Sequence, residues 1–122
     1  MITMLLVDDQ PVVRRCLRMR LALEPDLLIV GEAADGAAAL ALAQQLLPDV
    51  VLMDMLMPRM DGIAATSALR VAVPGSAVIM LSLHDDPASQ ARAQAAGARA
   101  FVVKHDGVDR LIAAVRQAAS SI

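Results

Sequence analysis

Five short apolar runs, each followed by a longer segment of helical period, organise this chain. The runs are rich in Val, Ile, Leu and Met, and they occupy residues 3–7, 27–32, 50–53, 78–81 and 100–103. This alternation predicts βα units around one parallel sheet. Because the runs are almost continuously hydrophobic, we expect strands that are covered on both faces by helices.

The first helix is predicted to begin at Pro11, a favoured first helical position, and to dock on the sheet through an apolar stripe. That stripe consists of Val13, Cys16, Leu17 and Leu21, and the arginines expected to face outward are Arg14, Arg15 and Arg18. Its place in the stripe makes Cys16 a buried structural thiol in this interpretation.

The other four helices are predicted from their caps and their periodicity. One runs from about residue 36 to residue 47, and the next follows Asp61 as its N-cap. Asp86 caps a fourth helix that begins with a proline and has Gly97 past its end. The fifth has apolar residues at the i, i+3, i+4, i+7 spacing, namely Val108, Leu111, Ile112 and Val115. Five strands and five helices account for the whole chain, so we expect a single domain over residues 1–122.

Size and composition narrow the classes of function. The 122 residues are 57% apolar and 20% charged, which suits one compact core rather than a disordered chain. The net charge of −2 and the lack of a basic run interleaved with aromatics argue against a nucleic-acid surface. The apolar start, residues 2–7, is too short to span a bilayer, and the single cysteine fits a reducing compartment. We therefore expect a cytoplasmic protein that does not engage a membrane.

Polar side chains stand at the ends of four of the five runs. Asp8 and Asp9 follow the first run, Asp54 the third, Ser82 the fourth, and Lys104, the one lysine of the chain, the fifth. In an open parallel sheet the ligand crevice lies outside the carboxyl ends of the strands, so these side chains should meet at one edge. The polarity of the strands therefore predicts where the site lies.

Three carboxylates at one edge need a counter-charge. At about 4 Å and an effective dielectric near 20, each pair repels by about 4 kcal/mol. A hard divalent cation with oxygen ligands relieves this repulsion, so we assign Mg²⁺ to Asp8, Asp9 and Asp54. A carboxylate can also attack phosphorus and become an aspartyl phosphate. Lys104 would then supply a point charge, and Ser82 a hydroxyl donor, for the phosphoryl oxygens.

Each of these residues also has a plainer interpretation. Asp9, which precedes Gln10 and Pro11, is equally consistent with an N-cap of the following helix. A Lys or Ser at the end of a strand is most often a solvated terminus. It is the coincidence of these groups at one sheet edge that favours a site.

Taken together, these residues resemble the receiver domain of two-component response regulators (CheY-like) over essentially the whole chain. The resemblance is strongest over residues 53–62, MDMLMPRMDG, and extends to the acidic pair after the first run, to Ser82 and to residues 101–104. It implies an α/β, flavodoxin-like (βα)5 fold, with an open five-stranded parallel sheet in the strand order 2-1-3-4-5 and helices on both faces.

The resemblance also implies roles for the site residues. Asp54 would be the phosphoacceptor, and Lys104 and Ser82 would contact the phosphoryl group. The Mg²⁺ ligands would be Asp8, Asp9, Asp54 and the backbone carbonyl of Leu56, with Asp9 the main direct ligand. Ser82 and Phe101 would form a switch pair. By this resemblance the chain would assist its own phosphorylation and slow autodephosphorylation without being an enzyme.

Residues 7–14 (VDDQPVVR) and 30–36 (VGEAADG) look like the subclass joined to a C-terminal LuxR-type helix-turn-helix domain, the NarL/FixJ-like proteins. That subclass implies a sensor histidine kinase as donor, a phosphorylation-dependent homodimer and control of transcription. DNA would be contacted only through a C-terminal domain absent from this chain. We expect residues 120–122 to begin a linker. The alternative is a standalone receiver that has protein partners only.

The chain departs from the family pattern at two places. His105 stands where many receivers have Pro after the active-site Lys. The predicted fourth helix has no Leu, Ile, Val, Met or aromatic residue between residues 88 and 96, where the family usually places larger aliphatics.

Two other classes of protein share parts of this pattern. A phosphohydrolase of the haloacid-dehalogenase type also uses an Asp nucleophile, Mg²⁺, a hydroxyl and a Lys. It needs a second acid two residues after the nucleophile, where this chain has Leu56. A flavodoxin-like cofactor binder favours aromatics beside its flavin, and Phe101 is the only aromatic residue of the chain. Phosphatase activity would reveal the first class, and a yellow bound flavin would reveal the second.

Overall fold

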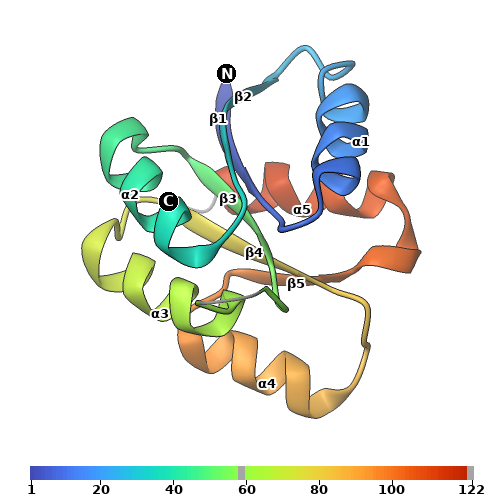
Figure 1. Ribbon diagram of the computed structural model, residues 1–122. Coiled ribbons are helices and arrows are strands. Elements are labelled where there is room, and N and C mark those ends of the chain that lie inside the picture. Colours follow the sequence, from blue (N-terminus) through green and yellow to red (C-terminus); the bar gives the residue numbers. More distant parts are fainter. Residues whose placement is uncertain (58–59, 121–122) are drawn as a thin grey trace.

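The computed structural model describes residues 1–57 and 60–120, and it arranges five parallel strands in one sheet with helices around it (Figure 1). The strands lie in the order β2-β1-β3-β4-β5, which confirms the expected flavodoxin-like order. Pro58 and Arg59, from the motif over residues 53–62, and residues 121–122 of the expected linker lie outside the described residues. In the described part of the chain, no helix is long and apolar enough to cross a membrane.

Each strand begins and ends within one residue of its predicted limits. The strands are β1 (Ile2–Val7), β2 (Leu27–Ala33), β3 (Val50–Asp54), β4 (Ala77–Ser82) and β5 (Ala100–Val103). The strands β3 and β4 are buried at every position, as expected for strands covered on both faces, whereas the edge strand β2 is partly open. Asp54 and Ser82 are the last residues of β3 and β4, so both polar side chains are buried at the same edge.

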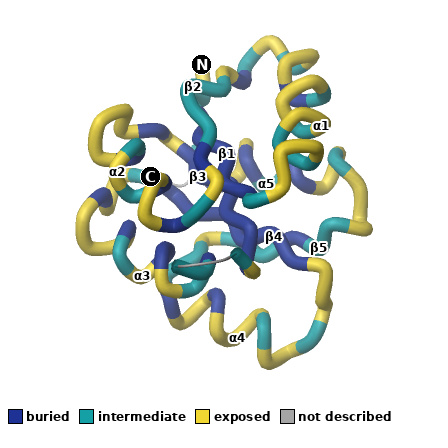
Figure 2. Tube along the Cα trace, viewed as in Figure 1, coloured by how far each residue is buried: buried dark blue, intermediate teal, exposed yellow. Residues whose placement is uncertain are grey.

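Two layers of helices cover the sheet. The helices are α1 (Pro11–Leu21), α2 (Gly36–Leu46), α3 (Gly62–Ala72), α4 (Pro87–Ala96) and α5 (Val108–Ser120). On one face, Leu21 of α1 and Val115 of α5 pack with Leu52 of β3. On the other face, α2, α3 and α4 form a second core that contains Leu69 and Met80. Figure 2 shows the buried strands at the centre and the exposed outer sides of the helices.

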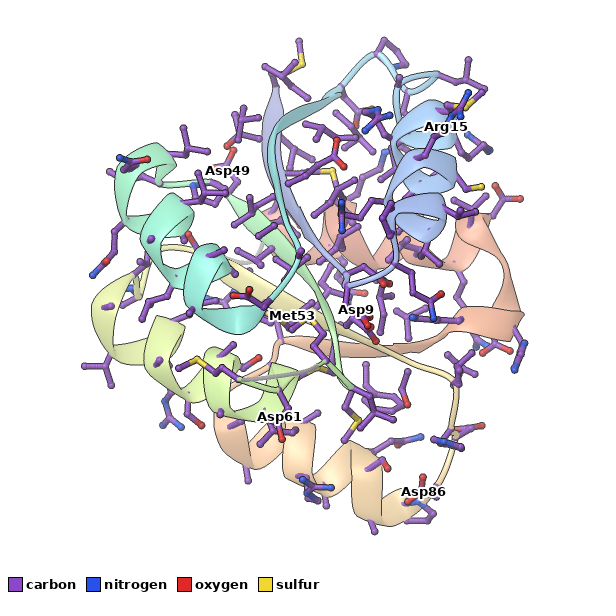
Figure 3. All side chains as sticks on the ribbon, in the orientation of Figure 1. Asp9, Arg15, Asp49, Met53, Asp61 and Asp86 are labelled. Carbon is purple, nitrogen blue, oxygen red and sulfur yellow. The ribbon has the colours of Figure 1, made fainter. Side chains whose placement is uncertain are left out.

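The predicted caps are present at the starts of two helices. Asp61 accepts a hydrogen bond from the backbone N–H of Ala64, 2.8 Å away, and thereby caps α3. Asp86, which lies at the start of α4 in Figure 3, caps that helix by accepting a hydrogen bond from the backbone N–H of Ser89, 3.0 Å away. The helix α4 ends at Gly97, whose φ of 109° lies in the left-handed region that glycine adopts readily. A short 3₁₀ turn, η1 (Lys104–Asp106), joins β5 to α5 and was not predicted.

Helix α1 differs from the prediction at two positions. Cys16 is exposed, so its interpretation as a buried thiol was wrong. The physical reason is that only Leu21 of the predicted stripe is fully buried, and the stripe otherwise borders an open, apolar cleft of about 330 Å³ between α1 and α5. Arg14 was expected to face outward, yet it is folded inward and leaves 18% of its side chain exposed.

Helix α4 buries little side-chain surface. Its only buried residues are Ala93 and Ala96. Alanine carries a single side-chain carbon, so the apolar area that anchors this helix is small compared with that of α5, which buries Leu111, Ile112, Val115 and Ala118.

Candidate functional site

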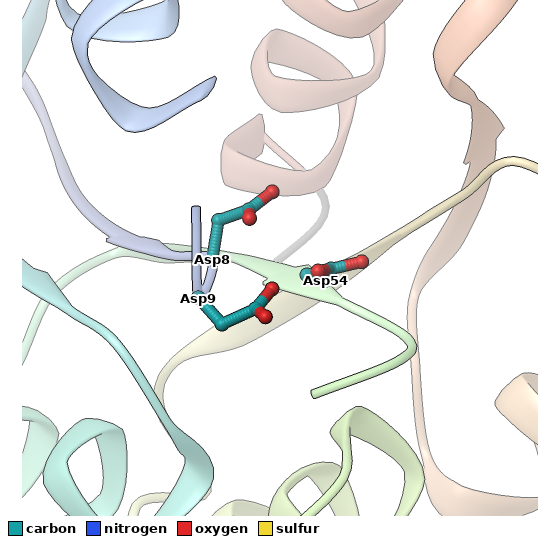
Figure 4. Close-up of side chains that lie close together, drawn as sticks. All are labelled: Asp8, Asp9 and Asp54. Carbon is teal, nitrogen blue, oxygen red and sulfur yellow. The ribbon is translucent and has the colours of Figure 1, made fainter. Parts of the chain in front are cut away.

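The carboxyl ends of β1 and β3 bring three carboxylates together, as the strand polarity predicts (Figure 4). Asp8 and Asp9 directly follow β1, and Asp54 ends the neighbouring strand β3. One carboxylate oxygen from each residue lies within 4.8 Å of the others. Asp8 and Asp54 are buried, and Asp9 is the most accessible of the three. Hard oxygen ligands this close together fit a divalent cation such as Mg²⁺.

Lys104 reaches the same site from the carboxyl end of β5, the last strand in the sheet order. It is the first residue of η1, directly after β5, and its Nζ lies 3.2 Å from Oδ2 of Asp8 and 3.2 Å from Oδ1 of Asp54. Its side chain is 21% exposed, so the ammonium group is largely enclosed between the two acids. One ammonium cannot neutralise three carboxylates, and the cluster therefore retains a negative charge.

Burial and neighbouring charges shift the titration of this cluster. Burial, followed by the charge of Asp8, raises the pKa of Asp54 to about 6, although Lys104 and the backbone N–H of Leu56 oppose the rise. Burial lowers the pKa of Lys104, but the carboxylates of Asp54 and Asp8 outweigh burial and raise it overall. Asp54 is thus mostly ionised at pH 7, in surroundings that disfavour its charge.

Ser82 and Phe101 lie on neighbouring strands and on the same face of the sheet. In the pairing of β4 with β5, Met80 is opposite Phe101 and Ser82 is opposite Val103. Because side chains alternate along a strand, Ser82 and Phe101 share a face. The buried Ser82 hydroxyl accepts a hydrogen bond from the backbone N–H of His84, 3.0 Å away. Phe101 is half-buried against the core under α3 and α4, and its role as a switch stays a prediction.

Arg14 holds the backbone of Asp8, a contact that the sequence analysis missed. Its Nη1 donates a hydrogen bond to the Asp8 carbonyl, and its Nε lies 3.3 Å from Oε1 of Glu32 on β2. Arg14 thereby ties the turn after β1 to the neighbouring strand. A signal existed in the sequence, since an arginine near the start of a helix opposes the helix dipole and needs another reason to be there.

Helix α3 packs directly against the backbone that carries Asp54. The N–H of Gly62 donates to the carbonyl of Met55 at 3.0 Å. A Cβ added at Gly62 would lie only 2.2 Å from the Asp54 carbonyl oxygen, so no larger residue fits there. The Asp-Gly pair at the start of α3 therefore serves two purposes: the first residue caps the helix, and the second lets it approach the site.

The helix-cap interpretation of Asp9 was wrong. The N-cap of α1 is Gln10, which makes no side-chain capping bond. It is Asp8 that accepts a hydrogen bond from the backbone N–H of Gln10, at 2.9 Å. Asp9 consequently remains available to a ligand at the edge of the site.

Comparisons with known proteins identify the class of protein. The family model described as the response regulator receiver domain matches residues 4–116, so the chain belongs to this family. The chain is 42% identical over 120 residues to the transcriptional regulatory protein UhpA of Escherichia coli (strain K12), an alignment that covers 98% of this chain and 60% of UhpA. It is 40% identical over 108 residues to the probable transcriptional regulatory protein NarL of Mycobacterium tuberculosis (strain ATCC 25618 / H37Rv), with 88% of this chain and 50% of NarL covered.

Solved structures share the fold. The signal receiver domain of the putative response regulator NarL from Mycobacterium tuberculosis superimposes with a TM-score of 0.93 at 36% identity, covering 99% of this chain and 98% of that domain. A two-component response regulator of the LuxR family from Aurantimonas sp. SI85-9A1 gives 0.93 at 31% identity, with 98% of this chain and 85% of that chain covered. These relatives confirm the expected resemblance to receivers of the LuxR and NarL type. The chain spans about half the length of the curated relatives it matches.

Proposed function

We propose that residues 1–122 form one receiver domain, which accepts a phosphoryl group on Asp54 from a sensor histidine kinase in the presence of Mg²⁺. The observation that carries this proposal is the position of Asp54. Its carboxylate ends a buried central strand, 3.2 Å from the ammonium group of Lys104 and beside the carboxylates of Asp8 and Asp9.

In the proposed reaction, a carboxylate oxygen of Asp54 attacks the phosphorus of the phosphohistidine donor. The new P–O bond forms as the P–N bond breaks, and the electron pair of the P–N bond leaves with the imidazole nitrogen. At pH 7 Asp54, with a pKa of about 6, is mostly the anionic nucleophile that this step needs. Lys104 then pairs with the phosphoryl oxygens, and the Ser82 hydroxyl donates a hydrogen bond to one of them.

Mg²⁺ would be held by Asp8, Asp9 and Asp54 and by the backbone carbonyl of Leu56. When bound, it supplies the positive charge that offsets repulsion between the carboxylates and the phosphoryl group. The closeness of the three carboxylate oxygens supports this assignment, as does the negative charge that Lys104 leaves uncompensated.

The proposed output is control of transcription through a phosphorylation-dependent homodimer, with Ser82 and Phe101 passing the signal from the site. DNA would be contacted by a domain outside this chain. The longer relatives that are transcriptional regulatory proteins support this part of the proposal. Turnover of external phosphoesters is not part of it, because an exposed apolar residue, Leu56, occupies the place of the acid that a haloacid-dehalogenase-type enzyme needs.

Intact-mass analysis after incubation with acetyl phosphate and Mg²⁺ tests the proposal. We expect the chain to gain the mass of one phosphoryl group, and Asp54→Asn to gain none, because an amide cannot form the acyl phosphate. Asp85→Asn, which changes an exposed aspartate outside the site, is the matched control and should be labelled like the wild type. Equal labelling of the wild type and Asp54→Asn would overturn the assignment.

A further inference from the structure

Arg14 is a largely buried cation that the proposed phosphoryl transfer does not use. It lies near the start of α1, and only 18% of its side chain is exposed. An arginine there faces the positive end of the helix dipole, and burial adds the cost of removing its charge from water. Contacts that compensate for both costs hold it in place, and these contacts indicate what it does.

The Arg14 side chain connects the turn after β1 to the edge strand β2. Its Nη1 donates a hydrogen bond to the backbone carbonyl of Asp8, and its Nε lies 3.3 Å from Oε1 of Glu32. The Nε–H has no aligned hydrogen-bond acceptor among the described residues, so its attraction to Glu32 is mainly that of opposite charges. The other oxygen of Glu32 accepts a hydrogen bond from Arg18, which fixes the carboxylate. Glu32 thus anchors the guanidinium that is bonded to Asp8.

Asp9 depends on its backbone for its position in the site. The carboxylate of Asp8 is held by the backbone N–H of Gln10 and by Lys104, and that of Asp54 is held by Lys104. In the part of the chain that the structure describes, the Asp9 carboxylate has no hydrogen bond or ion pair of its own. A planar peptide group links the carbonyl of Asp8 rigidly to the nitrogen and Cα of Asp9. The bond from Arg14 to that carbonyl therefore holds the peptide plane from which Asp9 projects.

We propose that Arg14 is a positioning residue for Asp9 as a ligand of Mg²⁺, and that Glu32 acts through Arg14. This role rests on the proposed function, because it concerns the metal that phosphoryl transfer would need. Neither residue would touch the metal or the phosphoryl group. Arg14 would keep Asp9 beside the other two carboxylates before the ion arrives, so that less freedom is lost when the ion binds.

Charge and position predict opposite effects when Arg14 is replaced. Removing a cation that is bonded to the backbone of Asp8 should by its charge alone tighten Mg²⁺ binding, because a repulsion between two cations is lost. Losing the hydrogen bond to the Asp8 carbonyl should weaken Mg²⁺ binding, because Asp9 is then no longer held in place. The direction of the change in affinity therefore distinguishes a positioning role from a purely electrostatic one.

Calorimetric titration with Mg²⁺ at constant ionic strength tests the role in Arg14→Met, which keeps an apolar stem and removes the guanidinium. We expect the affinity to fall by about tenfold, at the low end of what residues that hold metal ligands contribute. Arg15→Met, which removes an exposed charge from the same helix, should bind like the wild type. Affinity in Arg14→Met that equals or exceeds that of the wild type would overturn the proposal. A wild-type chain that bound no Mg²⁺ would instead overturn the metal assignment itself.

Glu32→Gln tests whether Glu32 acts through Arg14. Alone it should weaken Mg²⁺ binding by about fivefold, the size of effect that coupled neighbours show. In the Arg14→Met background the same change should have no further effect, because the guanidinium that Glu32 anchors is gone. An equal effect in both backgrounds would show that Glu32 acts by its charge alone, and would overturn its part in the proposal.

Backbone dynamics of the metal-free chain give a readout that does not depend on the ion. The ¹⁵N order parameter of the Asp9 amide should be lower in Arg14→Met than in the wild type, while that of Asp54 in β3 is unchanged. An unchanged order parameter at Asp9 would show that Arg14 stabilises the turn without positioning Asp9. If Arg14→Met does not fold, Glu32→Gln, at a side chain that is 25% exposed, serves for both measurements.

Discussion

The Nζ of Lys104 lies 3.2 Å from Oδ1 of Asp54, and the same nitrogen lies 3.2 Å from Oδ2 of Asp8. One cation therefore compensates two buried acids, with Asp9 as a third carboxylate beside them. The folded chain thus carries a charge imbalance at this edge, which the unfolded chain does not have. This imbalance predicts how the site responds to protons, to metal and to substitution.

The stability of the metal-free chain should fall as the pH rises from about 4 to about 6. The pKa of Asp54 is about 6 in the folded state against 3.8 ordinarily, so between these values the folded state binds more protons than the unfolded state. The stability that protonated Asp54 contributes is fully present below pH 3.8 and is lost as the pH passes through 6. A shift of this size corresponds to about 2–3 kcal/mol. Urea unfolding at a series of pH values, with a chelator present, measures it.

Asp54→Asn separates this effect from the titration of the other acids. The amide is neutral at every pH, so the variant should lose the fall between pH 4 and pH 6 and be more stable than the wild type at pH 7. The exposed Asp85→Asn change should keep the fall. If the stabilities of the wild type and Asp54→Asn change with pH in parallel, the pKa of Asp54 is not raised in the folded state.

Removing the cation should make Asp54 harder to ionise. Lys104 lowers the pKa of Asp54, both through its charge and through a hydrogen bond, so Lys104→Met should raise that pKa above its wild-type value. Carboxyl ¹³C shifts of Asp54 followed against pH, without metal, measure the change. Arg92→Met, at an exposed position on α4, is the control and should leave the titration where it is. If Asp54 titrates identically in Lys104→Met and in the wild type, Lys104 does not interact with Asp54 in solution.

Asp9→Asn should impair metal binding without harming the fold. Asp9 is the most accessible of the three carboxylates and does not cap α1, so the amide removes a ligand and part of the repulsion but no structural bond among those the described residues show. Replacing a residue that only holds a metal ligand in place typically costs about 10–100-fold in metal affinity, so the loss of a direct ligand should weaken Mg²⁺ binding by at least roughly tenfold. Calorimetric titration with Mg²⁺ measures the affinity. Unchanged affinity would remove Asp9 from the ligand set.

The positions of Asp54, Ser82 and Lys104 were predictable because they follow from strand polarity alone. A parallel sheet places every carboxyl end at one edge, and each of these side chains ends a strand or directly follows one. Contacts that depend on the rotation of a helix were not predictable. Arg14 is largely buried and Cys16 is exposed, the reverse of what was predicted, because apolar periodicity gives the buried side of α1 only approximately. The ion pair of Arg14 with Glu32 could not be predicted either, since it depends on the placement of β2 beside α1.

A cleft of about 220 Å³ at the amino ends of β4 and β5, lined by Thr66 and Arg70 among others, was not predicted either, for a different reason. Its residues come from α3, from the loop before β4 and from the turn before β5, and none of them forms a motif in the sequence. Their grouping depends on how closely α3 approaches the end of α4, where Gly97 leaves room for the Arg70 side chain. Only the packed structure supplies that distance.

Helix α4 should be the most readily displaced of the helices that cover its face of the sheet. Its buried side chains are Ala93 and Ala96, so opening it exposes little apolar area, and its amides should exchange hydrogen faster than those on the buried side of α5. The phosphoryl mimic beryllofluoride, added with Mg²⁺, offers the Ser82 hydroxyl a new hydrogen-bond acceptor. Movement of Ser82 toward the mimic should shift the loop from β4 to α4, because the backbone N–H of His84 in that loop is bonded to the Ser82 hydroxyl.

Phe101 shares a face with Ser82 and is only half-buried, so it can turn into space that a moving Ser82 loop vacates and thereby couple the site to α4. We therefore expect the largest change in hydrogen exchange on adding the mimic between residues 84 and 101. Phe101→Ala should diminish that change, and Asp54→Asn, which cannot hold the mimic, should abolish it. If the amides of α4 already exchange as slowly as those of β3 and do not respond to the mimic, α4 is a rigid element and the signal leaves the site by another route.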